Sequence, residues 1–347
     1  MTSLKLGYTA GYWSSGPPAG AVEAIQAADS LGFDSVWSAE AYGSDALTPL
    51  AWWGASTERV KLGTAIVQMS ARTPAATAMA ALTLDHLSGG RFILGIGASG
   101  PQVVEGWYGE PYPRPLERTR EYVEIVRSIM RRDRPVEFHG KHYDMPYSGD
   151  DGLGIGKALK STVHPLRNDI PIFLGAEGPK NVSLAAEICD GWLPLFFSPK
   201  EDAWYRDRLQ SGFEASGEVE KAERFEIAAP VTIIPGDDIE ACADMIRPFV
   251  ALYAGGMGAR EVNFHFDVFA RMGWEHIALQ VQELYLQGKK QEAAAIIPLE
   301  MVEDVAIIGP PDKIRDDLAR WEETCLTTLL VGGPAGLLPV LADLVLG

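Results

Sequence analysis

The feature that most constrains the fold of this chain is a repeated alternation of short apolar runs with longer amphipathic segments. The runs are rich in β-branched residues, which is typical of strands buried on both faces of a parallel sheet. In the segments between them, apolar residues recur at helical spacing. The expected strands are Leu4–Thr9, Ser35–Ser38, Val60–Val67, Arg91–Ile96, Ile170–Leu174, Trp192–Phe196, Phe225–Ile234 and Thr327–Val331.

Helices are predicted between these strands and after the last one. They are Ala19–Leu31, Pro49–Thr57, Pro74–Leu87, Pro115–Arg132, Lys180–Ile188, Lys200–Ala215, Ile239–Tyr253, Pro311–Glu323 and Leu337–Leu346. Eight strand–helix units favour an α/β fold of the (β/α)8-barrel type over an open doubly wound sheet, which has the same local pattern. A single domain spanning residues 1–347 is expected, because barrels with insertions commonly exceed about 250 residues.

Two segments interrupt the alternation. Pro135–Pro165 is rich in Gly, Pro, His and Tyr, so we expect an excursion over the surface and interpret it as a lid. Gly255–Leu299 is mostly helical in pattern and lacks a clear strand, so we expect an insertion. Both are expected to shape the substrate site, and neither identifies the substrate.

Composition excludes several classes of function. The net charge of −17 argues against nucleic acid and anionic membranes as partners. No apolar stretch is long enough to span a membrane, and Met1–Thr9 does not resemble a signal peptide. The three cysteines, Cys189, Cys242 and Cys325, are far apart, which indicates reduced thiols in a cytoplasm. No HExxH or other metal-binding pattern occurs, so no metal is expected.

In a barrel, functional side chains follow the carboxyl ends of the strands. Glu40 follows the second strand and is a candidate proton donor or acceptor, or else a hydrogen-bonded structural carboxylate. Gly175–Asn181 is a small-residue turn from a strand into a helix, a place where free N–H groups and Lys180 could bind an anion. The alternative for this turn is a plain stabilising connection.

A third candidate is the spacing Gly95-x-Gly97-x-x-Gly100, which matches a dinucleotide fingerprint only weakly. It lies in the fourth unit rather than the first, and Pro101 interrupts the start of the helix, so we reject a Rossmann interpretation. A glycine-lined wall against which a planar ring can lie is the preferred interpretation.

Taken together, these segments resemble the luciferase-like superfamily of flavin- and coenzyme F420-dependent enzymes. The stretches that carry the resemblance are Gly63–Val67, Leu84–Gly97, Ala98–Gly109, Gly175–Asn181 and Cys189–Trp192. Ser99–Val103 is most similar to F420-dependent reductases that resemble methylenetetrahydromethanopterin reductase. The resemblance implies a (β/α)8 barrel, usually dimeric, with a non-proline cis peptide bond at Ala65-Ile66.

The resemblance also implies where the deazaflavin would bind. Its phosphate would lie near Glu177, Gly178, Lys180 and Asn181, and its ring near the ends of the third and fourth strands. The cofactor-binding residues implied in this way are Ala39, Glu40, Thr64, Ala65, Ile66, Gln68, Gly97, Ala98, Ser99, Gly100, Gln102, Val103, Gly175, Ala176, Glu177, Gly178, Lys180 and Asn181.

One departure from the family pattern concerns the reaction. F420-dependent sugar-phosphate dehydrogenases place an Asp-His pair after the second strand, where this chain has Ala39-Glu40. Alcohol oxidation by a histidine base is therefore not expected, and Glu40 becomes the candidate catalytic residue.

Three hypotheses follow from the sequence. The first is an F420-dependent oxidoreductase that acts on a small organic substrate and forms a homodimer. The second is an FMN-dependent monooxygenase supplied with reduced flavin by a partner, and the third is a non-catalytic protein that binds flavin or deazaflavin.

Overall fold

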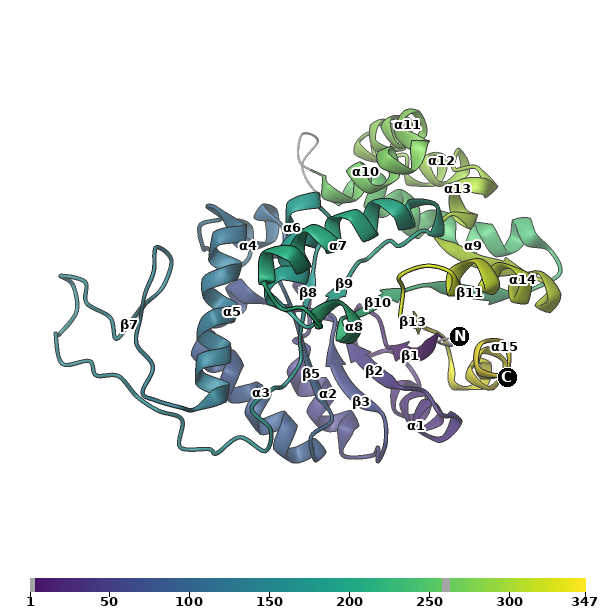
Figure 1. The fold of residues 1–347 in the computed structure, drawn as a ribbon. Helices are drawn as coiled ribbons and strands as arrows, with labels where there is room; N and C mark the ends of the chain where they lie inside the picture. Colours follow the sequence, from purple (N-terminus) through teal and green to yellow (C-terminus); the bar gives the residue numbers. More distant parts are fainter. Residues whose placement is uncertain (1–3, 258–262) are drawn as a thin grey trace.

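Eight parallel strands close into a barrel surrounded by helices (Figure 1), as the alternation predicts. This computed structural model describes residues 4–257 and 263–347. The ring strands, in the order in which neighbours pair, are β1 (Lys5–Thr9), β2 (Ser35–Ser38), β3 (Lys61–Thr64), β5 (Phe92–Gly97), β8 (Ile172–Gly175), β9 (Gly191–Leu193), β10 (Glu226–Pro230) and β13 (Thr328–Val331). β13 pairs with β1, and this pairing closes the ring.

The helices lie outside this ring, and most of the longer ones bury one face against it. They are α1 (Ala21–Leu31), α2 (Leu47–Gly54), α3 (Pro74–Ser88), α4 (Pro101–Gly106), α5 (Pro115–Arg131), α6 (Pro179–Ile188), α7 (Asp202–Ser216), α8 (Lys221–Arg224), α9 (Ile239–Ala251), α14 (Pro311–Glu322) and α15 (Leu338–Leu346). The amphipathic pattern of α5 is confirmed, because Tyr122, Ile125, Val126 and Ile129 all lie in the core.

The inside of the barrel is filled by a separate cluster of side chains from β2, β5, β8, β9, β10 and β13. Its buried members are Trp37, Ile93, Phe173, Leu193, Ala228 and Leu330, with the partly buried Ala65 and Ile66 packed against it. The ring centroids of Trp37 and Phe173 lie 5.8 Å apart. Gly63 makes room for Trp37, because a Cβ there would lie within 2.6 Å of three atoms of the indole. The barrel is therefore a packed core rather than a pore.

The predicted strand Val60–Val67 is interrupted in the structure. It forms β3 and then β4 (Val67–Gln68), separated by Ala65-Ile66, whose peptide bond is cis as the resemblance implied. Gly63 pairs with Ile93 and Val67 with Ile96, so three residues of the interrupted strand face two residues of β5. This is a β-bulge, and bulges bend a strand and redirect its side chains.

The hydroxyl of Thr64 joins the two strands at this bulge. It donates to Gly95 O at 2.7 Å and accepts from Gly95 N at 2.8 Å. The side chain thus supplies both hydrogen bonds that an uninterrupted ladder would have given to Gly95. The close approach also requires a glycine, because a Cβ at position 95 would overlap the backbone oxygen of Thr64.

A strand that the sequence analysis did not predict extends the C-terminal part of the fold. β12 (Ala306–Gly309) pairs in parallel with β11 (Thr232–Pro235), which continues from β10 within the predicted strand Phe225–Ile234. Its run of Ala306, Ile307 and Ile308 is too short to separate a strand from a buried helix end by periodicity. The pair lies outside the eight-stranded ring.

The predicted insertion is confirmed as helical. It comprises α10 (Phe264–Phe269), α11 (Glu275–Leu286), α12 (Lys290–Ala295) and α13 (Leu299–Glu303), with π-helical turns at Leu252–Gly256 and Ala270–Trp274. Residues 258–262 of the predicted segment lie outside the described residues. Its buried side chains form their own cluster with α9 and β12. The single-domain assignment of residues 1–347 stays a prediction.

The predicted excursion, residues 135–165, leaves the barrel beyond α5 and extends away from it (Figure 1). It contains only a short hairpin, β6 (Phe138–His139) with β7 (Asp144–Met145). The Glu121 carboxylate of α5 accepts the N–H groups of Lys141, His142 and Tyr143, which fixes the hairpin to that helix. The lid role of this segment stays a prediction.

Within the two described ranges, no helix has the length and apolar character needed to cross a membrane. In the same ranges, no group of three or more His, Cys, Asp or Glu residues is placed to hold a metal ion.

Gly95→Ala should strongly destabilise the protein, because the added methyl group meets the backbone of Thr64 rather than a movable side chain. We expect the free energy of unfolding, measured by urea titration, to fall by about 3 kcal/mol or more. Gly106→Ala is the matched control, since a Cβ there meets nothing within 4 Å. Equal stability of the two variants would contradict this account of the bulge.

Candidate functional site

The residues that the sequence analysis singled out lie in four loops at one end of the barrel. These loops follow β2, β3, β5 and β8, and the strands are parallel, so their carboxyl ends meet on the same face. The four loops therefore form one site.

The floor of this site is made by Ile66 and two glycines. A Cβ at position 97 would lie 2.6 Å from Cδ1 of Ile66, and one at position 175 would lie 3.0 Å from its Cγ2. Only glycines at the ends of β5 and β8 allow Ile66 to cover the top of the barrel core. The bulge after β3 thus places an apolar side chain at the end of the barrel, where an apolar ring could lie against it.

Glu40 is buried, with 5% of its surface exposed, and the neighbours of its carboxylate are donors. Arg72 Nη1 lies 2.9 Å from both Oε1 and Oε2. The backbone N–H of Gln68 donates to Oε1 at 3.0 Å, and that of Ala46 donates to Oε2 at 3.3 Å. Each contact satisfies a buried charge that would otherwise be costly.

The backbone of Glu40 is tied to the same segment of the bulge. Its N–H donates to Ile66 O at 3.2 Å, and its carbonyl accepts from Nε2 of Gln68, also at 3.2 Å. The backbone of Glu40 is therefore hydrogen-bonded to both Ile66 and Gln68, the two ends of the short segment that contains the floor residue Ile66. The sequence analysis did not identify Arg72, because 32 residues separate it from Glu40 and only the fold joins them.

Where α6 begins after β8, Pro179 has no N–H, and the N–H groups of Asn181 and Val182 both donate to Gly178 O, at 3.0 and 2.9 Å. Gly178 precedes α6 in an extended conformation, with Pro179 in the first turn. Lys180 is exposed, whereas Asn181 is partly buried, and its Oδ1 is a buried atom without a partner in the structure. Trp192 Nε1 on β9 donates to Ala176 O at 2.8 Å, and this hydrogen bond holds the turn against β9.

Glu177 lies in this turn and is partly buried, and its carboxylate accepts the Leu195 N–H at 2.6 Å. Burial raises the pKa of Glu177 to about 8, although the Leu195 N–H and the charge of Arg271 both act to lower it. The carboxyl is therefore largely protonated at neutral pH. A neutral carboxyl can stand beside an anionic ligand without repelling it.

The insertion places Arg271 near Glu177. The sequence analysis did not consider this residue. Its guanidinium carbon lies 4.0 Å from the ring centroid of Trp204, and its Nε lies 4.0 Å from Oε2 of Glu201. Nε is a buried donor without a hydrogen-bond partner in the structure. Burial and the nearby Glu177 raise the pKa of Tyr205, whose hydroxyl is likewise buried without a partner.

An aromatic cluster joins the insertion to the loop after β9. The ring of His265 lies 4.9 Å from that of Tyr253 and 6.1 Å from that of Phe196, both in edge-on arrangements. Burial lowers the pKa of His265 to about 4, so the imidazole is neutral at neutral pH. Asn263 holds this end of α10 by accepting the N–H groups of His265 and Phe266.

The loop after β5 contains the remaining predicted residues. Ser99 has a positive φ of 60°, and its carbonyl accepts the hydroxyl of Tyr112 at 2.8 Å. Ala98, Gly100 and Val103 are partly buried. Gln102, in contrast, is exposed on α4.

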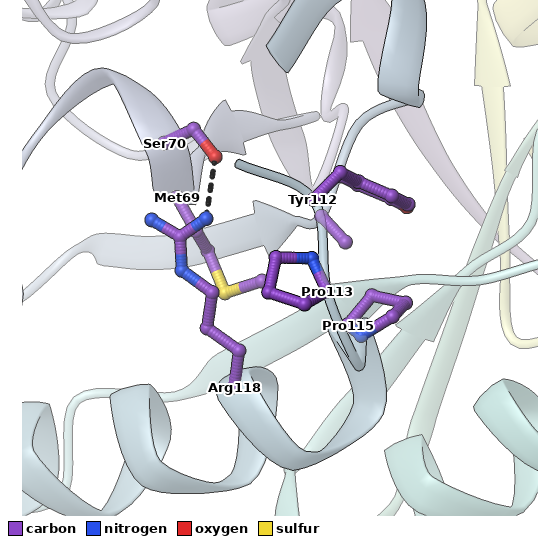
Figure 2. A pocket seen from close by; sticks show the side chains of 7 residues that line it. Met69, Ser70, Tyr112, Pro113, Pro115 and Arg118 are labelled. Atoms are coloured by element: carbon purple, nitrogen blue, oxygen red, sulfur yellow. Dashed lines mark hydrogen bonds between the residues drawn. The ribbon is translucent and has the colours of Figure 1, made fainter. Parts of the chain in front are cut away.

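A small cavity lies beside Ala98 (Figure 2). Arg118 and Ser70 both line this cavity, and Arg118 Nη1 donates to Ser70 Oγ at 3.1 Å. The remaining lining residues are Met69, Tyr112, Pro113 and Pro115. Its volume of about 10 Å³ is room for one water, so a tricyclic ring does not fit within it.

The larger cleft of about 290 Å³ lies between α9 and α12 and contains none of the predicted site residues. Arg247 lines it but is already bonded to Glu240, Asp244 and Ile297 O. The cleft therefore has no evident role in the site described above.

The residues present fit a ring with an anionic tail. The floor is apolar, and the amino end of α6 offers the N–H of Lys180, with the side chains of Lys180 and Arg271 nearby. Several buried polar atoms of these loops and of the elements packed on them have no partner in the structure: Gln68 Oε1, Asn181 Oδ1, Tyr205 OH and Arg271 Nε. Such atoms are costly unless a ligand or water satisfies them.

Comparison with known proteins identifies the family of this chain. A sequence model of the luciferase-like monooxygenase family matches residues 4–328. A Mycobacterium tuberculosis protein, whose name provisionally assigns it as a coenzyme F420-dependent oxidoreductase, is 56% identical over 94% of this chain and 94% of its own.

Two archaeal proteins are more distant. The 5,10-methylenetetrahydromethanopterin reductase of Archaeoglobus fulgidus is 26% identical over 90% of this chain and 89% of its own. The solved structure of the coenzyme F420-dependent tetrahydromethanopterin reductase of Methanopyrus kandleri superposes with a TM-score of 0.81 at 23% identity. It covers 99% of both chains and shows that the fold is shared.

The raised pKa of Glu177 predicts a stability that falls with pH. An unfolded glutamate loses its proton near 4.5, whereas the folded carboxyl keeps it until about 8. This contribution is thus fully present below pH 4.5 and is lost as the pH rises towards 8. Glu177→Gln removes the titration, so between about pH 5 and 9 the wild type should lose about 2–4 kcal/mol relative to the variant.

The measurement is urea denaturation of both proteins at several pH values. Glu300→Gln, at an exposed position, is the control and should follow the wild type within about 0.5 kcal/mol. Parallel pH profiles for wild type and Glu177→Gln would show that Glu177 ionises normally.

Proposed function

Because the chain belongs to the luciferase-like monooxygenase family, we propose that it is a coenzyme F420-dependent oxidoreductase acting on a small organic substrate. The observation that carries the proposal is the apolar floor of Ile66, Gly97 and Gly175 beside the amino end of α6. The 56% identity to a relative named for F420 dependence supports this cofactor over FMN. Bound deazaflavin would supply hydride transfer without oxygen chemistry.

The chain's own residues would bind the two ends of the cofactor differently. Ala65, Ile66 and Gly97 would carry the ring, and the loop from Ala98 to Val103 would lie against its edge. The N–H of Lys180 and the positive end of α6, a helix of 10 residues, would hold the phosphate. The side chains of Lys180 and Arg271 would add positive charge at this place, in a chain whose net charge is −17.

We propose that Glu40 is a positioning residue for the floor. Its carboxylate and backbone contact Arg72, Ile66 and Gln68, so that the geometry of the bulge depends on it. The prediction from the sequence is that Glu40 transfers a proton beside the ring. The two roles differ in their effect on the pH profile of turnover.

We also propose a cytoplasmic location and a homodimer. Three free cysteines, two of them buried, support a reducing compartment. The family resemblance supports the dimer. The substrate itself is expected to be found by assaying oxidation of reduced F420 with a panel of acceptors.

Titration of the purified protein with F420 and, separately, with FMN tests the cofactor by fluorescence. We expect saturable F420 binding and negligible FMN binding, and the reverse result would favour the monooxygenase hypothesis. Lys180→Ala should weaken F420 binding by about 1–3 kcal/mol, because a charge-assisted hydrogen bond to the phosphate is lost. Lys289→Ala, an exposed lysine between α11 and α12, should leave the affinity unchanged.

Glu40→Gln and Arg72→Met together separate the two roles of Glu40. If Glu40 positions the floor, both variants should lower F420 affinity and turnover by similar factors and keep the shape of the pH profile. If Glu40 transfers the proton, Glu40→Gln alone should lose one limb of the profile and about 10²–10⁴ in kcat. Unchanged turnover of Glu40→Gln at all pH values would remove Glu40 from both roles.

A further inference from the structure

Four aromatic side chains, which we call the aromatic rim, come from separate loops around the candidate site: Tyr12, Tyr42, Trp107 and Tyr253. Tyr12 follows β1, Tyr42 follows β2, and Trp107 directly follows α4, the helix after β5. These three residues are 49%, 59% and 64% exposed, so their rings are not part of the packed core. Because their loops follow the carboxyl ends of strands, the rim lies at the same end of the barrel as Ile66.

Contacts between the rings show that the rim is continuous with the insertion. The rings of Tyr42 and Trp107 lie 6.5 Å apart. Tyr253 lies in the π-helical turn after α9, and its ring is 5.5 Å from that of Phe196, which follows β9. Burial and the neighbouring hydroxyl of Tyr12, which hydrogen-bonds to Tyr253, raise the pKa of Tyr253, and Tyr42 acts in the same direction. The loops after β1, β2 and β9 therefore meet the insertion at one place.

The pair of Tyr12 and Tyr253 has two hydroxyl protons and forms one hydrogen bond between them. This bond raises the pKa of Tyr253 and so favours its protonated form, which makes Tyr253 the donor and Tyr12 the acceptor. The O–H of Tyr12 then remains available to a ligand. The ring of His265 lies 4.9 Å from that of Tyr253, and its Nδ1 is a buried atom without a partner in the structure. The rim thus places a few neutral polar atoms within an apolar surface.

The loops beside the rim are uncharged, although 22% of the chain is charged. Residues 10–20, 194–199 and 332–337, which follow β1, β9 and β13, contain no Asp, Glu, Lys, Arg or His. In the loop after β2, the carboxylates of Glu40 and Asp45 are already bonded to donors. This side of the site therefore lacks the charge that is found at the turn after β8.

The difference in charge separates two kinds of ligand. Lys180 and Arg271 lie near the turn after β8, where the phosphate of the cofactor is proposed to bind. A charged group beside the rim would lose its water without gaining a counter-ion from the three uncharged loops, which is unfavourable. An apolar ring would instead gain from burial against aromatic side chains.

We propose that the aromatic rim binds an uncharged, largely apolar substrate with one hydrogen-bond acceptor, which accepts from the hydroxyl of Tyr12. A ketone joined to an aromatic or alicyclic ring is the simplest molecule of this class. The inference rests on the proposed function, because it names the substrate class of the same site. Sugar phosphates and other anionic substrates lie outside this class.

Three probes of similar shape test the class by equilibrium dialysis against the full chain at neutral pH: 2-acetylnaphthalene, 2-ethylnaphthalene and 2-naphthoate. We expect the neutral ketone, 2-acetylnaphthalene, to bind most tightly. The hydrocarbon lacks the acceptor and should bind about three- to tenfold more weakly. The carboxylate should bind at least about a hundredfold more weakly than the ketone, because its charge would be buried without a partner.

Tyr12→Phe keeps the ring and removes the hydroxyl. It should weaken binding of 2-acetylnaphthalene by about three- to tenfold and leave that of 2-ethylnaphthalene unchanged. Tyr147→Phe, at an exposed position of the excursion, is the control and should bind both probes like the wild type. Trp107→Ala should weaken both neutral probes by about fivefold or more, because apolar contact is lost. Its control is Trp52→Ala, at an exposed position on α2, which should bind like the wild type.

F420 titration of the same proteins separates this inference from the proposed function. A wild type that binds F420 but none of the three probes would overturn the inference alone. A wild type that binds 2-acetylnaphthalene but not F420 would count against the cofactor and leave the inference standing. Tighter binding of 2-naphthoate than of the ketone would overturn the uncharged class, and an unchanged affinity of Tyr12→Phe for the ketone would overturn the hydrogen bond.

Discussion

The junction of β3 and β5 is the constraint on which the rest of the site depends. The bulge leaves Gly95 without ladder partners, and the Thr64 hydroxyl replaces both of them. Because the barrel stays closed at this junction, Ile66 in the bulge can turn inward. Ile66 then covers the barrel core, and Gly97 and Gly175 leave it the space to do so. A packed barrel and an apolar floor thus arise from the same local irregularity.

Electrostatics around the site are arranged against an acidic background. The charge of Glu40 is compensated by Arg72 and by two backbone N–H groups. Glu177 differs, because burial raises its pKa to about 8 and keeps it largely protonated. With both carboxyls compensated, the proposed binding of an anionic tail by Lys180 and Arg271 is compatible with a chain whose net charge is −17.

The two interruptions of the barrel have different relations to the site. The insertion after α9 has its own buried cluster and brings Arg271 and His265 towards the loops that follow β8 and β9. The excursion after α5 contacts α3 and α5 and turns its apolar side chains outward. The insertion therefore lies beside the candidate site, whereas the excursion lies on α3 and α5 with exposed apolar side chains.

The alternating pattern by itself determined the eight strands, their helices and the barrel, because burial on both faces of parallel strands leaves a strong local signal in the residues. It also located the loops of the site, since function in a barrel follows the carboxyl ends of strands. The sequence analysis did not predict β12, because its four buried residues show no periodicity that separates a strand from a helix. The pairing of Glu40 with Arg72 and the placement of Arg271 near Glu177 were decided only by the tertiary structure. Residues 32 and 94 positions apart come together only through how the chain closes in space, and no local propensity encodes that distance.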